Sequence, residues 1–104
     1  MIIAEFIGNN PKTGFKVKGH AEYARSGKDI VCAAVTSAVQ LTANGITEIL
    51  KTDAEVIVNE DEIKLSLPQN SPKAAYDFVE ALYLHLNIMS GNYRKNVKVI
   101  VTEV

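Results

Sequence analysis

One cysteine and one of the two histidines lie close together in the sequence, and these residue types can perform nucleophilic catalysis. Cys32 is the only cysteine of the 104-residue chain, and His20 precedes it by twelve residues. A thiolate attacks carbonyl carbons, and a nearby imidazole can take the thiol proton. Asp29 adds a carboxylate that can orient the imidazole. These residues are the candidate nucleophile, base and supporting acid.

The residues around Cys32 predict that it lies near the start of a helix. An apolar segment begins at Ile30 and contains no glycine before Gly45. Asp29 can cap this helix, which places Cys32 at about the third helical position. Unpaired first-turn amides and the helix dipole favour a thiolate there and can stabilise an oxyanion. Asp29 therefore has two competing roles, helix cap and orientation of His20, and its sequence position favours the cap.

The same residues resemble those of a known family, the ribosomal-processing cysteine proteases of certain bacteria. The matching segments are Gly19-His20-Ala21, a loop containing Gly27, and Asp29-Ile30-Val31-Cys32-Ala33-Ala34, in the order and at the histidine-to-cysteine spacing of the family. The length and the order of strands also agree, so the resemblance covers essentially the whole chain.

This resemblance implies a small homodimeric endopeptidase without a cofactor. Its substrate would be a large-subunit ribosomal protein, from which it removes a short N-terminal extension. Cys32 would be the nucleophile, His20 its base and Asp29 a supporting residue. The family often has serine where this chain has Thr36, which Ser37 follows. Either hydroxyl is therefore a candidate helper.

Two other interpretations compete with a protease. Free cysteines are often buried and act as small hydrophobic residues. In that case the chain is a non-catalytic ribosome-associated binding module or a structural homodimer, with Cys32 in its core. Thiol alkylation distinguishes these cases, because a core cysteine is protected until the protein unfolds.

Composition excludes several other classes of protein. A formal net charge of −1 and a pI near 6.1 do not predict the basic surface that nucleic-acid binding needs. The N-terminal residues lack a basic segment before an apolar stretch, and we expect no membrane span and a cytoplasmic location. One cysteine cannot form an intramolecular disulfide, and with two separated histidines it predicts no metal site.

Hydrophobic periodicity predicts a single α+β domain over residues 1–104, in the order β-β-α-β-β-α-β. Two helices should cover one face of a mixed, largely antiparallel sheet. If the other face is as apolar as Ile2, Ala4 and Ile100 suggest, it needs a partner, and a homodimer is the simplest one. The expected strands cover 2–7, 15–20, 54–58, 63–67 and 97–101, and the expected helices begin near residues 30 and 72.

Three glycines carry further expectations. Gly27 lies in the segment 22–28, which we interpret as a surface loop that either closes over substrate or is only a solvated connection. Gly45 costs about 1 kcal/mol of helix propensity relative to alanine, so it marks a bend, a tight contact or an earlier helix end. Gly91 and Asn92 are expected to stop the second helix.

His85 borders the apolar stripe of that helix and is interpreted as structural, with a backbone hydrogen-bond partner.

Overall fold

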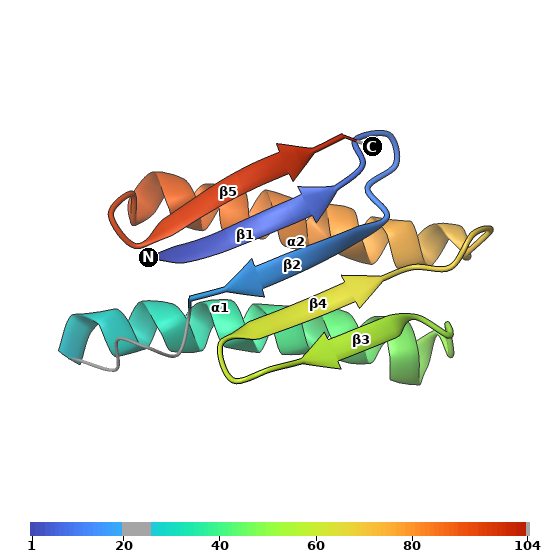
Figure 1. Ribbon diagram of the computed structural model, residues 1–104, viewed down its shortest axis with the longest axis horizontal. Helices are drawn as coiled ribbons and strands as arrows, with labels where there is room; N and C mark the ends of the chain where they lie inside the picture. The colour runs from blue at the N-terminus through green and yellow to red at the C-terminus, as the bar shows by residue number, and fades with distance from the viewer. Residues whose placement is uncertain (20–25, 104) are drawn as a thin grey trace.

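Five strands and two long helices follow one another in the predicted order (Figure 1). The computed structural model describes residues 1–19 and 26–103, and it describes side chains for 1–19 and 30–103. The elements are β1 (Ile2–Ile7), β2 (Gly14–Lys18), α1 (Ser26–Asn44), the π-helical turn η1 (Gly45–Ile49), β3 (Glu55–Val58), β4 (Glu62–Ser66), α2 (Lys73–Asn92) and β5 (Val97–Thr102).

The strands form one mixed sheet in the order β3-β4-β2-β1-β5. The pairs β1–β2, β2–β4 and β3–β4 are antiparallel, and only β5 runs parallel to its neighbour β1. Both helices lie on the same side of the sheet, with α1 behind β4 and β3 and α2 behind β1 and β5 (Figure 1). The predicted single α+β arrangement is therefore confirmed.

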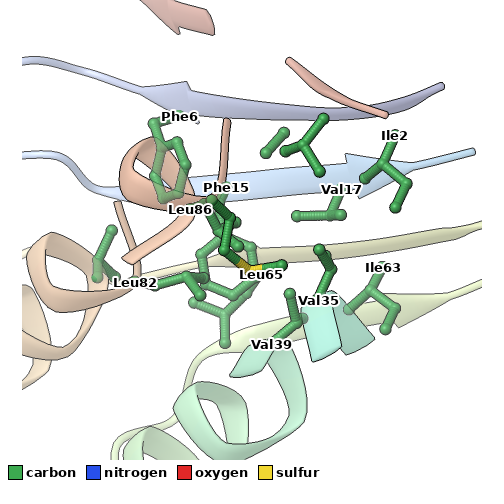
Figure 2. Close-up of a cluster of buried hydrophobic side chains, with 14 of the residues drawn as sticks. Ile2, Phe6, Phe15, Val17, Val35, Val39, Ile63, Leu65, Leu82 and Leu86 are labelled. Atoms are coloured by element: carbon green, nitrogen blue, oxygen red, sulfur yellow. The ribbon is translucent and has the colours of Figure 1, made fainter. Parts of the chain in front are cut away.

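The core lies between the sheet and the helices because alternate strand residues point toward the helices. Figure 2 shows Phe6, Phe15 and Leu65 from the strands packed against Val39 and Leu86 from the helices. Side chains from β1, β2, α1, η1, β4, α2 and β5 are almost fully buried. They are Ile2, Ala4, Phe6, Phe15, Val17, Val31, Val35, Val39, Ile46, Ile63, Leu65, Ala75, Val79, Leu82, Leu86, Met89 and Val97.

The open face of the sheet is mixed in character: Ile100 stands there opposite Glu5, but Ile2 and Ala4 do not lie on it. Ile2 and Ala4 are buried on the side of the helices. The alternate residues of the same strands face outward, and the Lys16 Nζ lies 3.7 Å from Glu5 Oε1 on that surface. Lys64 stands opposite Lys16 in the ladder. An apolar open face therefore gives no reason for dimerisation.

Gly45 marks both the end of the regular α-helix and a tight contact. α1 ends at Asn44, and the chain continues through the π-helical turn η1. A Cβ atom at Gly45 would lie 2.7 Å from two ring atoms of Phe78 on α2. Helical spacing predicts that Ile49 shares the apolar stripe of Val31, Val35 and Ile46. The π turn changes the rotation per residue, and Ile49 is exposed.

α2 ends where the sequence predicted. Asn92 is its last residue, and the N–H of Tyr93, the C-cap residue, donates to the Met89 carbonyl. Gly91 is itself helical and lies one residue before the end, which agrees with glycine being a poor helix former.

The α1–η1 segment is longer and more apolar than we expected from the sequence. Residues Ile30–Ile49 are long and apolar enough to cross a membrane by length and composition, with a mean hydropathy of 1.4. The expectation that no apolar run reaches this length was therefore wrong. The core helix of a globular domain passes the same test, and one side of α1 packs on the sheet of this chain.

We expect Gly45→Ala to lower the free energy of unfolding by about 1 kcal/mol or more, because the added methyl group overpacks against the Phe78 ring. Urea denaturation midpoints measure the effect. Gly91→Ala is the matched control, since nothing lies within 4 Å of the added atom. That variant should gain up to about 1 kcal/mol, because alanine is the better helix former. Equal stabilisation of both variants would show that the contact is not tight.

Candidate functional site

Gly19 determines how the chain leaves β2 toward His20. Its φ angle is +87°, and a Cβ atom there would collide with the carbonyl oxygen of Met1. Its N–H donates to the Asp61 carbonyl at 3.0 Å, in the turn between β3 and β4. The start of β1 and the β3–β4 turn thus hold this position, which only glycine fills without strain. His20 itself lies outside the described residues.

α1 begins earlier than the sequence predicted. Its first residue is Ser26, so Gly27 lies in the first helical turn and not in a loop. Asp29 is the fourth helical residue and is therefore not the N-cap. The early start agrees with the preference of serine for helix N-termini, and the preference of acidic residues for the first turn suits Asp29 at this position as well.

Cys32 is the seventh residue of α1 and lies in its second turn. Its side chain is partly buried and packs against the core. Residues three and four apart share one side of a helix, so the backbone places Asp29 before Cys32 and Thr36 after it on the same flank. The helix therefore aligns three of the predicted site residues.

Ser37 lies on a different side of α1. It lines a largely apolar groove between the helices, with a volume of about 550 Å³, together with Leu41 of α1 and Phe78 and His85 of α2. The His85 side chain is exposed in this groove. Among the described residues it makes no hydrogen bond, so the backbone partner that we expected is not found there. Of the two candidate hydroxyl residues, only Thr36 lies on the same flank of α1 as Cys32.

The hydroxyl of Thr36 differs from those of two other threonines in this segment. The hydroxyls of Thr42 and Thr47 donate to the carbonyls of Ala38 and Ala43, at 2.8 and 3.0 Å. Within residues 1–19 and 30–103, Thr36 makes no such bond to the preceding turn. Its hydroxyl is therefore available to a group on the Cys32 flank.

Sequence reasoning missed the two backbone groups that hold Gly19, the Met1 carbonyl and the Asp61 carbonyl. Met1 precedes β1 and Asp61 lies in the β3–β4 turn, and no residue type identifies a backbone partner in advance. In the part of the chain that the structure describes, no three His, Cys, Asp or Glu residues are grouped to hold a metal ion.

A family model described as "Cysteine protease Prp" matches residues 1–98 of the chain. The ribosomal processing cysteine protease Prp of Bacillus subtilis (strain 168) is 28% identical over 91 residues, which cover 82% of this chain and 81% of that protein. The matched segment of the family model includes Gly19, His20, Asp29 and Cys32.

Solved structures share the fold. SMU.848 from Streptococcus mutans has a TM-score of 0.92 and 23% identity, covering 100% of this chain and 96% of that one. The essential ribosomal processing protease Prp from S. aureus, in complex with a substrate peptide, has a TM-score of 0.89 and 17% identity, covering 98% and 100%. At these identities the likeness concerns the fold alone.

Gly19→Ala should lower the free energy of unfolding by about 1–3 kcal/mol, because it combines a positive φ with a backbone collision. Thermal and urea denaturation measure the loss. The neighbouring exposed residue supplies the control, and Lys18→Ala should stay within about 0.5 kcal/mol of the unmodified protein. If both variants are equally stable, the β2 exit is not held as described.

Proposed function

This chain belongs to the cysteine protease Prp family and is a cysteine-type peptidase, and we propose that it removes a short N-terminal extension from a large-subunit ribosomal protein. In this proposal Cys32 is the nucleophile and His20 is its base. The observation that carries the proposal is the family match over residues 1–98, which includes the only cysteine of the chain. The partial exposure of Cys32 on the α1 flank supports a reacting thiol more than a core residue.

The proposed reaction begins when His20 takes the proton of the Cys32 thiol. The thiolate forms a bond to the scissile carbonyl carbon, and the imidazolium then gives its proton to the leaving amine as the C–N bond breaks. A water molecule hydrolyses the resulting thioester, with His20 taking a proton from that water. This second half regenerates the thiol and releases the N-terminal extension as an acid.

The helix start suggests where the oxyanion of the intermediate is stabilised. The first four N–H groups of a helix have no intrahelical partner, and in α1 those of residues 26–28 are among them. Because Cα–Cβ bonds in a helix tilt toward its N-terminus, the Cys32 side chain leans toward this turn. We therefore assign the oxyanion donors to the turn before Cys32, one turn earlier than a helix capped by Asp29 would place them.

The revised helix start also changes the proposed role of Asp29. Its backbone lies inside the helix, so orientation of the His20 imidazole is now the better supported of its two roles. Thr36 is the better candidate for the helper hydroxyl, since its side chain leans over the turn that carries Cys32. Ser37 points into the groove between α1 and α2 and is assigned no part in the reaction.

The names of the relatives support the proposed substrate class. The B. subtilis protein is named as a ribosomal processing protease, and the S. aureus protease is solved with a substrate peptide. We extend this substrate to the present chain and propose a homodimer in the cytoplasm. Leu41, Leu84 and Ile88 are more than half exposed on the outer side of the helices. This surface suits a second copy better than the mixed open face of the sheet.

Incubation with the ribosomal protein that carries its native N-terminal extension tests the activity directly. We expect the unmodified protein to release one N-terminal fragment, detected by intact mass spectrometry, and Cys32→Ala to release none. His20→Ala should lower turnover by about a hundredfold or more, as general-base removal does. His85→Ala is the matched histidine control and should retain turnover. Equal losses in both histidine variants, with unchanged stability, would contradict the assignment of His20.

Thr36→Val should lower kcat/KM by about tenfold, because it removes one hydroxyl at nearly constant volume beside the reacting thiol. Thr36→Ser should restore most of the activity. Ser37→Ala is the control on the other side of α1 and should stay within about twofold of the unmodified protein. The rate of Cys32 alkylation by iodoacetamide at neutral pH gives a second readout. If kcat/KM falls further in Ser37→Ala than in Thr36→Val, Ser37 and not Thr36 supplies the helper hydroxyl.

A further inference from the structure

β3 forms one edge of the sheet among the described strands, and this edge is unusually apolar. It pairs with β4 on one side only. Val56, Ile57 and Val58 are all exposed and follow one another without a lysine or a proline. Proteins usually protect open edges with such residues, because an unprotected edge pairs with other extended chains. The opposite edge, β5, carries Lys98 within its strand.

The hydrogen-bond pattern shows which groups of β3 are free. The Asn59 N–H donates to the Glu62 carbonyl, which makes this the first hydrogen-bonded pair of the hairpin. Hydrogen-bonded and non-hydrogen-bonded pairs alternate along antiparallel strands. Ile57 therefore points its N–H and C=O toward β4, whereas Val56 and Val58 point theirs toward the open edge. These groups can receive another strand.

The side chains of Val56 and Val58 form an uncovered apolar shelf on the helix side of the sheet. Val58 stands opposite Ile63 and Val56 stands opposite Leu65, so each pair shares one face. Ile63 and Leu65 are 9% and 0% exposed, whereas Val58 and Val56 are 69% and 39% exposed. The helix layer therefore covers β4 but leaves the β3 part of the same face open.

The flank of α1 that carries Cys32 and the edge strand β3 lie on the same side of the molecule. Each residue rotates the helix by about 100°. Ala34, Ala38 and Leu41 line the groove toward α2, which puts Cys32 and Thr36 on the flank away from α2. β3 lies on that side, and its arrow points toward the end of the molecule where α1 begins (Figure 1). A chain that follows the edge past Val58 is therefore directed toward the Cys32 turn.

We propose that a segment of the substrate polypeptide binds as an added strand along β3, with main-chain hydrogen bonds to Val56 and Val58. The inference rests on the proposed function, because its occupant is the substrate of the Cys32 site. The fitting segment is extended, has no proline opposite these two residues, and places alternate apolar side chains over the shelf. Addition of a strand to a sheet edge supplies affinity through the main chain. The direction of β3, toward the end of the molecule where α1 begins, favours substrate over a second copy of this chain (Figure 1).

Val58→Pro tests this docking mode, because proline removes the N–H that faces the open edge and leaves the β4 ladder intact. With the precursor ribosomal protein as substrate, we expect KM to rise about fivefold, the effect of one lost hydrogen bond, with kcat within about twofold. Iodoacetamide should alkylate Cys32 at an unchanged rate. Val101→Pro is the control on β5. The Ile2 N–H donates to the Asn96 carbonyl and the Gly8 N–H to the Thr102 carbonyl, so the even-numbered residues of β5 pair with β1. The backbone N–H of Val101, an odd-numbered residue, therefore points toward the open edge.

Substrate peptides that are N-methylated at one residue at a time test the same bonds without changing the protein. Methylation at alternate residues on one side of the cleaved bond should lower kcat/KM about fivefold, and methylation at the residues between them should have little effect. An unchanged KM in a folded Val58→Pro variant, or a methylation effect without a period of two, overturns the docking mode. Failure of the unmodified protein to cleave the precursor would instead overturn the proposed function. A change of oligomeric state in Val58→Pro, with unchanged KM, would assign the edge to a second copy.

Discussion

The burial of one side of α1 against the sheet is the interaction on which the rest of the structure depends. Val31, Val35 and Val39 are almost fully buried in the core that the strands form (Figure 2). Burial of each such side chain contributes about 1.5–3 kcal/mol, which is large relative to the preferences of single surface residues. This stripe determines the rotation of α1, and the rotation determines which flank carries Cys32.

Once the rotation of α1 is set, neighbouring residues obtain different environments. Cys32 and Thr36 lie on the flank beside β3, and Ser37 lines the groove beside α2. Neighbouring hydroxyls that are equivalent as residue types thus become unequal as candidates for chemistry. The shelf at β3 stays uncovered, since Val56 and Val58 are exposed while their partners Leu65 and Ile63 on β4 are buried.

Contacts away from Cys32 hold the other end of the sheet to α2. The Lys12 side chain is buried, with its ammonium 4.2 Å from the centre of the Tyr83 ring and 3.3 Å from a Glu80 carboxylate oxygen. The Phe6 and Tyr83 rings meet edge to face at 5.3 Å between centroids. None of these residues takes part in the proposed reaction. Packing at this end therefore stabilises the layers while the Cys32 flank remains partly exposed.

The sequence by itself determined the element order and the candidate nucleophile, because hydrophobic periodicity and the rarity of cysteine are local properties. It misplaced the start of α1 at Asp29, since both Ser26 and Asp29 are residue types that favour a helix N-terminus. Only the tertiary structure decided which face of the sheet holds Ile2 and Ala4, why position 19 needs glycine, and whether Thr36 or Ser37 follows Cys32. Each of these depends on what packs against a residue from a distant part of the chain, and periodicity alone does not specify that partner.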